Sequence, residues 1–391
     1  MHPSFARNIV HEFTQPLKDQ KRFIRKFDNE HWKGSLIMSE MIRCDDETAI
    51  KRLQKSDVVI FEIHGGGFRT GHSTMYMDSF INWLRLFKNK HNLYACIMSV
   101  EYGLAPKHKY PGPLNECIAA YNYLTQHLGV SPSKVIFSGD SAGGALAIET
   151  LIRTYAPQMI HDLDAPRTNF EIPLPAAILL SSPLVSPERD RDSWKKYEKQ
   201  DLVSSALYEL VFKEYLGLPE TKPEDLPILR MYKILHDFDR FLPKHVLTFV
   251  GKREVLRDGA VELCEAIKTD GKIEVSLIEE DFVHDWFMIH HVIGKSKMGM
   301  IHRYDELFVD FAVKAVQESN PASFVKASSK AERVEELEVN EDVDVVQEKV
   351  ILDEIQKSDE NVEVPTSSVI KSSTILSEYA VIVDEPRMDV Q

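Results

Sequence analysis

The sequence places a serine between glycines at a point where the chain changes from one apolar pattern to another. Residues 139–143 read Gly-Asp-Ser-Ala-Gly, the pattern G-x-S-x-G, with Ser141 at the centre. An apolar run at residues 135–137 precedes the pattern, and a helix-like run at residues 144–148 follows it. A serine at a sharp strand-to-helix turn projects from a strained elbow and can act as a nucleophile. The competing interpretation is a glycine-rich turn that only packs tightly.

A second glycine-rich segment could supply hydrogen-bond donors. Residues 64–67 read His-Gly-Gly-Gly and directly follow the apolar run at residues 58–63. Glycines leave backbone N–H groups unshielded, and acyl transfer through a tetrahedral oxyanion needs such donors. We expect Gly66 and Gly67 to supply two of these N–H groups and Ala142 a third. A phosphate-binding loop is disfavoured because the Lys-Ser/Thr pair of such loops does not follow the glycines.

A serine nucleophile needs a base, and the base needs a carboxylate that orients it. His284 follows a strand-like run at residues 273–278, and open α/β sheets place their sites beyond the carboxyl ends of strands. After another such run, at residues 246–250, Glu254 and Asp258 offer two carboxylates. We favour Glu254 because it is the first carboxylate beyond the strand. Asp258 stays the alternative acid.

Short apolar runs alternate with longer amphipathic stretches, which predicts an α/β fold with a mainly parallel sheet. The expected strands span residues 36–42, 58–63, 93–100, 135–138, 176–180, 246–250 and 273–278. The expected helices span residues 75–89, 113–128, 143–155, 204–216, 257–269 and 304–318. We expect a helical or cap segment over residues 1–30, a catalytic domain over 31–317 with a helical cap at about 186–243, and a tail over 318–391.

Taken in chain order, His-Gly-Gly-Gly-Phe, Gly-Asp-Ser-Ala-Gly-Gly, a carboxylate and a histidine resemble the α/β-hydrolase fold and its hormone-sensitive-lipase-like esterase branch. Residues 101–106, Glu-Tyr-Gly-Leu-Ala-Pro, resemble that branch's segment between the glycine loop and the serine elbow. The resemblance implies a central sheet with helices on both faces, a triad of Ser141, an acid and His284, and hydrolysis of small to medium carboxylic esters through an acyl-enzyme without a cofactor. The family's usual acid is Asp, and Glu254 occupies that position here.

The proline-rich insert and the His-Asp-Trp segment also resemble fungal steryl acetyl hydrolases. This narrower resemblance implies acetyl esters of sterols or other lipids as substrates. The alternative function, of a different class, is a catalytically silent module that binds a small ligand on the same fold.

The net charge of −14 lies mostly near the end of the chain. From Glu318 onward there are 18 acidic and 7 basic residues, a net charge of −11, which leaves −3 for the rest. This composition predicts a disordered acidic tail that is a candidate docking segment for a protein partner. The excess of acidic over basic residues excludes nucleic-acid binding as the function, because a protein that binds nucleic acid needs a basic face.

The sequence also bears on the cellular compartment of the protein and on whether it binds a metal. No apolar run approaches the ~20 residues that span a bilayer, so we expect no transmembrane segment. Four scattered cysteines without C-x-x-C spacing give no sign of a metal site or a disulfide framework. We therefore expect a cytoplasmic protein without a metal, whose peripheral association with a lipid surface stays open.

Overall fold

The computed structural model describes residues 12, 14–162, 173–217, 233–234, 236–290, 293–294 and 297–321. The chain divides into two units, Met1–Ser319 and Asn320–Gln391. The expected acidic tail lies outside the described residues from residue 322 onward, so its disorder and its docking role stay predictions.

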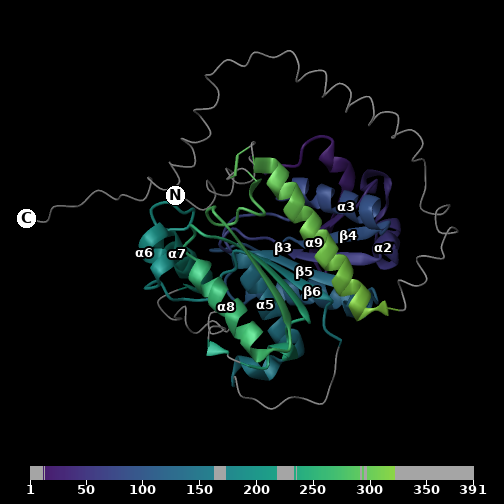
Figure 1. Cartoon of the computed structure of the whole chain (residues 1–391). Coiled ribbons are helices and arrows are strands. Elements are labelled where there is room, and N and C mark those ends of the chain that lie inside the picture. The colour runs from purple at the N-terminus through teal and green to yellow at the C-terminus, as the bar shows by residue number, and fades with distance from the viewer. Residues whose placement is uncertain are drawn as a thin grey trace, which may run out of the picture. The chain divides into compact units, whose positions relative to one another are not determined.

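An eight-stranded sheet forms the centre of the first unit (Figure 1). Its strands are β1 (Ile24–Asp28), β2 (Lys33–Ile37), β3 (Val58–Ile63), β4 (Ala95–Val100), β5 (Val135–Asp140), β6 (Ala177–Ser181), β7 (His245–Gly251) and β8 (Glu274–Glu280). They lie in the order β1-β2-β4-β3-β5-β6-β7-β8. The pairs β1–β2 and β2–β4 are antiparallel, and β3 to β8 run parallel. The mainly parallel sheet predicted from the alternating pattern is confirmed.

Helices connect the strands in the order that a parallel sheet requires. The α-helices are α2 (Asp46–Lys55), α3 (Met77–His91), α4 (Gly112–Asn122), α5 (Ala142–Tyr155), α6 (Asp192–Tyr197), α7 (Ser205–Phe212), α8 (Arg257–Asp270) and α9 (Met298–Ser319). The described 3₁₀ and π segments are η1 (Gln20–Phe23), η2 (Met41–Arg43), η3 (Tyr123–His127), η4 (Pro132–Lys134), η5 (Pro157–Ile160), η6 (Lys213–Gly217) and η9 (Phe238–Arg240). No helix within these described ranges has both the length and the apolar character to cross a membrane.

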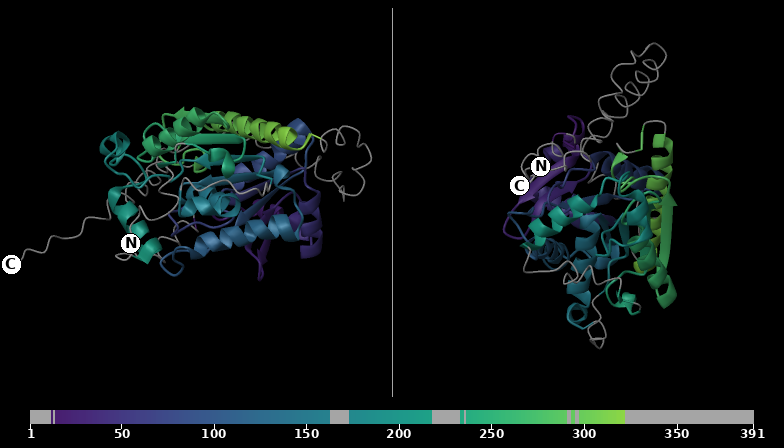
Figure 2. Two further views of the ribbon diagram at one scale, coloured as in Figure 1. Left: turned by 90° about the horizontal axis from the view of Figure 1, so that it is seen from below. Right: turned by 90° about the vertical axis from the view of Figure 1, so that its left-hand side faces the viewer.

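Helices cover both faces of the sheet (Figure 2). Successive side chains of a strand point to opposite faces, so each face has its own core layer. On one face Phe61 of β3 packs against Tyr121 of α4, with ring centroids 5.4 Å apart. On the other face α3 lies beside α9, and Trp83 packs against Phe308 at 4.6 Å. Burial on both faces explains why β3, β4 and β5 are mostly apolar and are buried along their whole length.

The structure differs from our expectation before residue 56. The strand expected over residues 36–42 ends at Ile37, and a turn and then η2 follow it. The helical or cap segment expected over residues 1–30 is wrong for its described end, because residues 24–28 form β1. This edge strand pairs antiparallel with β2, and only Phe27 in it is buried. Pairing with the next strand, β2, decides its structure, and a pattern with one buried residue does not reveal that pairing.

Helix α2 was not predicted from the sequence either, because it also has few buried residues. Only Ala49 and Leu53 of the helix are buried. Its start is fixed by Asp45, whose side chain accepts a hydrogen bond from the Thr48 N–H. The other six predicted strands and all six predicted helices correspond to observed elements, with two helices ending in the π segments η3 and η6.

Within the described residues, the cap expected at residues 186–243 contains short helices separated by loops and turns. It contains α6, α7, η6 and η9, and residues 218–232 of it lie outside the described ranges. The Ser204 side chain caps α7 by accepting a hydrogen bond from the Leu207 N–H. Helix α7 lies over the glycine loop that follows β3, since a Cβ atom on Gly67 would lie 2.9 Å from Val211 Cγ2. The cap therefore contacts the loop that the sequence pattern marks for chemistry.

Candidate active site

Ser141 forms the turn between β5 and α5. Its backbone has φ 50° and ψ −116°, a region that non-glycine residues rarely adopt. A close approach permits this sharp turn: a Cβ atom on Gly143 would lie 2.0 Å from the Ile63 carbonyl oxygen. The turn has the strand, elbow and helix geometry expected for a serine nucleophile, and the Ser141 side chain stays partly exposed.

His284 lies in the turn that follows β8 and faces Ser141. Its Nε2 atom is 2.9 Å from Ser141 Oγ, within hydrogen-bond distance. His284 is only 5% exposed. The structure thus brings together two residues that are 143 positions apart in the chain. This contact can carry the proton of the serine hydroxyl to the imidazole.

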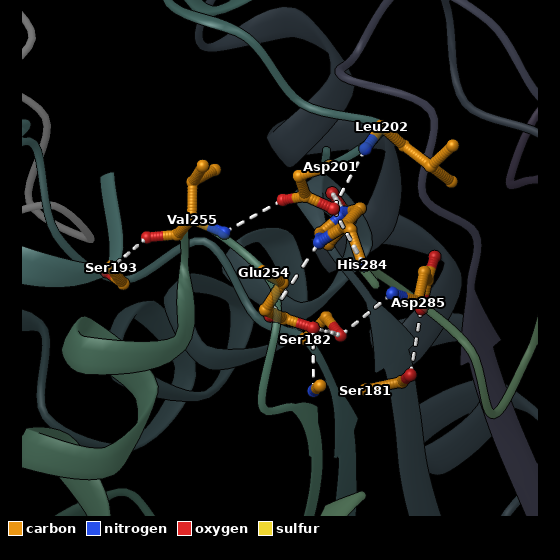
Figure 3. Close-up of polar contacts among 11 residues, drawn as sticks. Ser181, Ser182, Ser193, Asp201, Leu202, Glu254, Val255, His284 and Asp285 are labelled. Atoms are coloured by element: carbon orange, nitrogen blue, oxygen red, sulfur yellow. Dashed lines mark hydrogen bonds and ion pairs between the residues drawn. The ribbon is translucent and has the colours of Figure 1, made fainter. Parts of the chain in front are cut away.

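Of the two candidate acids, Glu254 faces the imidazole (Figure 3). Its Oε1 atom lies 3.7 Å from His284 Nδ1, which is longer than a hydrogen bond, and neither atom has another hydrogen-bond partner among the described residues. Catalytic hydrogen bonds often tighten only when substrate binds. The other oxygen, Oε2, accepts hydrogen bonds from Ser182 Oγ at 2.7 Å and the Gly251 N–H at 2.8 Å. Glu254 is fully buried, so its carboxylate has a fixed orientation.

Asp258, the alternative acid, is turned away from His284. Its Oδ2 atom accepts a hydrogen bond from the Ser193 N–H at 2.8 Å, and its Oδ1 atom pairs with Arg257 at 3.0 Å. The contact with Ser193 joins the start of α8 to the start of α6. The geometry therefore gives Asp258 a structural contact and leaves Glu254 beside the imidazole.

The electrostatic surroundings of His284 favour its protonated form. Burial by itself lowers the pKa of the imidazole, but the carboxylates of Glu254 and then Asp201 raise it, and the net pKa lies above the ordinary value. Asp140 adds to the increase. These carboxylates stabilise the imidazolium that forms when His284 accepts a proton.

We expect kcat/KM to fall as the pH drops through the pKa of His284, because protonated imidazole cannot accept the Ser141 proton. Since the carboxylates raise this pKa, the midpoint of the fall should lie above the ordinary histidine value of about 6.5. The measurement is kcat/KM for 4-nitrophenyl acetate from pH 5 to pH 9, corrected for spontaneous hydrolysis. A midpoint below the ordinary value would contradict the described surroundings of His284.

The glycine loop at residues 64–67 follows β3 and lies beside the serine turn. The Gly65 N–H donates to Asp140 Oδ1 at 2.8 Å, so the residue preceding the nucleophile fixes the loop. No acceptor among the described residues takes the N–H of Gly66 or Gly67. Ala142, the third expected donor, begins α5, where N–H groups have no partner within the helix. These three N–H groups are the candidate oxyanion donors.

A methyl group at Gly66 is expected to disturb this loop. Gly66 has φ +98°, and a Cβ atom there would lie 2.4 Å from the Thr70 carbonyl oxygen. We expect Gly66→Ala to lower kcat about 10²-fold, the typical cost of one misplaced oxyanion donor. Gly299→Ala is the matched control, because a Cβ atom at that helical position meets nothing within 4 Å. Equal kcat values for the two variants would remove Gly66 from the site.

The cap holds the glycine loop from its other side. Arg69, two residues beyond the loop, forms a largely buried ion pair with Glu214 of η6, with Nε and Oε2 2.5 Å apart. Phe68 stacks on Tyr215 with ring centroids 3.9 Å apart. A buried charge pair and a stacked ring pair join the same two segments, so this part of the cap acts as a support for the loop.

A network of buried polar groups lies beneath the triad and connects the glycine loop with Glu254. Burial, and then the nearby charge of Asp140, raise the pKa of Asp285 well above its ordinary value. Ser181 Oγ donates to Asp285 Oδ1 at 2.8 Å, and the Asp285 N–H donates to Ser182 Oγ at 3.0 Å. Ser182 in turn donates to Glu254. The carboxyl group of Asp285, which follows His284 in the sequence, is therefore part of this network of hydrogen bonds.

Side chains that could hold a metal gather once within the described ranges, at His245, Glu274 and Glu318. His245 begins β7, so this group lies at the opposite end of the strand from the triad. Lys244 pairs with Glu318 at 2.8 Å, and Lys314 pairs with Glu274 at 2.9 Å. Because lysines already balance both carboxylates, the group forms an ion-pair network distant from the site.

Two polar residues of the site carried no motif-based signal for their roles. Tyr76 donates its hydroxyl to Asp140 Oδ2 at 2.6 Å and so helps to hold the carboxylate that fixes the glycine loop. Asp201, in the cap, accepts hydrogen bonds from the backbone next to the triad. Asp201 belongs to the predicted cap, and only its burial and its contacts in the fold distinguish it from the other cap carboxylates.

The comparisons with known proteins agree with this geometry. A model of a family described as having the α/β-hydrolase fold matches residues 60–288, more than half of the chain. Lipase 2 of Moraxella sp. is 26% identical over 262 residues, which cover 59% of this chain and 55% of that protein. Hormone-sensitive lipase of Mus musculus is 33% identical over 126 residues, which cover 32% of this chain and 16% of that protein. The chain thus spans about half the length of the Moraxella lipase and less of the mouse lipase.

Solved structures show the same fold. An esterase/lipase from an uncultured bacterium superimposes with a TM-score of 0.59 at 22% identity, covering 80% of this chain and 92% of that one. An esterase from the bacterial hormone-sensitive lipase family superimposes with a TM-score of 0.58, with the same identity and coverage. The family match and the serine turn together lead to one conclusion: the chain belongs to a family with the α/β-hydrolase fold.

Proposed function

We propose that this protein hydrolyses carboxylic esters with a triad of Ser141, His284 and Glu254, through an acyl-enzyme. The observation that carries the proposal is the 2.9 Å contact between His284 Nε2 and Ser141 Oγ at the strained turn after β5. Glu254 faces the other ring nitrogen, and the glycine loop offers free N–H groups beside the turn. The relatives named lipase and esterase support the same reaction class.

Each group of the site has one task in the proposed reaction. As Ser141 Oγ bonds to the ester carbonyl carbon, His284 Nε2 accepts the hydroxyl proton. The carbonyl oxygen becomes an oxyanion, which the N–H groups of Gly66, Gly67 and Ala142 stabilise. Breaking the ester C–O bond releases the alcohol, which takes the proton from His284. Water then attacks the acyl-enzyme with the same proton transfers, and the carboxylic acid leaves.

Small to medium acyl esters are the proposed substrate class. The sequence resemblance to the hormone-sensitive-lipase-like esterases supports this size. Acetyl esters of sterols or other lipids are the narrower candidates. They are supported by the sequence resemblance to fungal steryl acetyl hydrolases.

A chain-length series tests the proposed function. The intact protein would be assayed with 4-nitrophenyl esters from acetate to decanoate and, in parallel, with a sterol acetate. We expect turnover of the short esters, with kcat/KM falling toward decanoate. If no ester is hydrolysed and a fluorophosphonate probe does not label the protein, the proposal is wrong and the ligand-binding alternative gains support.

A further inference from the structure

We propose that Asp201 is a positioning residue for catalysis: its carboxylate holds the backbone of His284 and of the segment after Glu254, and so fixes the imidazole between Ser141 and its acid. The proposal rests on the triad assigned under the proposed function. Asp201 comes from the cap, after α6, whereas the triad comes from the loops of the sheet. The cap would then complete the catalytic geometry in addition to covering the substrate.

The Asp201 carboxylate joins three backbone N–H groups (Figure 3). Its Oδ1 atom accepts hydrogen bonds from the N–H of His284 at 2.8 Å and of Leu202 at 2.8 Å. Its Oδ2 atom accepts one from the N–H of Val255 at 2.8 Å. One carboxylate therefore spans the loop that carries the base and the residue directly after the acid. Bonds from N–H groups to an ionised carboxylate are shorter and stronger than those to neutral acceptors.

The hydrogen bonds of the Asp201 carboxylate are shielded from water, so their loss should be costly. Asp201 is 8% exposed and Val255 is fully buried, so water cannot replace a lost acceptor at the Val255 N–H. No lysine or arginine among the described residues forms an ion pair with Asp201, and the backbone N–H groups are its main compensation. An unpaired buried N–H costs free energy, so loss of the carboxylate would force both loops to shift.

The charge of Asp201 also acts on the imidazole. Burial, together with repulsion from Glu254, raises the pKa of Asp201, while His284 and the N–H groups lower it. Asp201 in turn raises the pKa of His284, as do Glu254 and Asp140. Burial, and then the nearby charge of Asp140, raise the pKa of Asp285, which follows His284 in the chain. The carboxylates of Glu254, Asp201 and Asp140 act on His284 in the same direction, so removal of the Asp201 charge should lower the pKa of His284.

The test compares Asp201→Asn with wild type in the intact protein. Asparagine keeps the shape of the aspartate side chain, but its NH₂ group must face either the Val255 N–H or the His284 N–H. One hydrogen bond is then lost, because two donors face each other. We expect kcat to fall about tenfold to hundredfold, the cost of a small displacement of a catalytic group. We expect KM to stay within about threefold, because Asp201 lies behind the triad. The acid limb of the pH profile should move to lower pH.

Asp258→Asn is the matched control. Asp258 also joins the cap to the body of the protein through one backbone bond, to Ser193, but it does not face His284. If weakening the cap were the whole effect, both variants would lose activity alike and neither pH profile would move. We expect Asp258→Asn to keep the wild-type pH profile and a kcat within about threefold of wild type.

Two further measurements keep the proposal testable if Asp201→Asn does not fold. Asp201→Glu retains the charge but displaces both oxygens, so it should lower kcat and leave the acid limb near its wild-type position. In the wild-type protein, the amide hydrogens of Val255 and His284 should exchange slowly with solvent. Rapid exchange at both amides, or wild-type kcat and pH profile in a folded Asp201→Asn variant, would overturn the proposal.

A Ser141→Ala variant separates this inference from the proposed function. If Ser141→Ala is inactive while Asp201→Asn matches wild type, only the role of Asp201 is wrong. If Ser141→Ala keeps its activity, the triad itself is wrong, and the proposal for Asp201 fails with it.

Discussion

Replacing Ser141 by alanine is expected to lower kcat for 4-nitrophenyl acetate by about 10⁵–10⁶-fold, since loss of the nucleophile leaves only binding and the oxyanion donors. The residual rate should still exceed the rate in water, because Gly66 and Gly67 remain in place. His284→Ala should cost about as much as Ser141→Ala. The double variant should be no slower than either, because the two residues act as one unit.

The control for this series is Ser133, a partly exposed serine that precedes β5, at the opposite end of that strand from Ser141. Ser133, in η4, bonds only to Ser131 among the described side chains. Ser133→Ala should match wild type in kcat and in KM. Additive losses in the double variant, or a loss of less than about tenfold in Ser141→Ala, would show that Ser141 and His284 do not share one reaction step.

Glu254→Gln is expected to lower kcat by about 10³–10⁴-fold, for a reason visible in its hydrogen bonds. The amide oxygen of glutamine must replace Oε2, which accepts from Ser182 Oγ and from the Gly251 N–H. The amide NH₂ group then faces His284 Nδ1 and can only donate to it. Nδ1 becomes an acceptor, so Nε2 carries the hydrogen and cannot take the Ser141 proton.

The pH profile and a second variant check this account of the acid. Loss of the Glu254 charge should also move the acid limb of kcat/KM to lower pH, because Glu254 raises the pKa of His284. Asp258→Asn should keep kcat within about threefold of wild type, since Asp258 pairs with Arg257 and Ser193. A large loss in Asp258→Asn together with an active Glu254→Gln would reverse the choice between the two carboxylates.

The parts of the site that could be predicted from the sequence are those that short motifs determine. Gly143 must be glycine because the chain passes 2.0 Å from where its Cβ atom would lie, so the serine turn is visible as a local pattern. The glycine loop carries its signal in the same way. His284 could be identified because it follows a strand, and a parallel sheet gathers the carboxyl ends of its strands.

The parts that could not be predicted depend on contacts between distant residues. Asp201 is a carboxylate in a polar cap segment, and only the fold shows that it is buried against the backbone of His284. Tyr76 lies in a loop before α3, and 64 residues separate it from the Asp140 carboxylate that it holds. In each case the local sequence allows several structures, and tertiary contacts select one.

The acidic tail stays a prediction from composition. Its excess of charge leaves the chain before Glu318 nearly neutral, so charge says little about the ester substrate. The catalytic account therefore depends on the serine turn and its neighbours. Its central claim is that Ser141 is the group that becomes covalently modified.

Mass spectrometry after reaction with a fluorophosphonate probe tests that claim most directly. The probe forms a stable bond to an activated serine and mimics the first step of the proposed reaction. We expect one adduct per protein, located on the peptide that contains Ser141. We also expect no adduct in His284→Ala, because the serine then lacks its base. An adduct on a different residue, or ester hydrolysis by a protein in which Ser141 stays unmodified at saturating probe, would contradict the account.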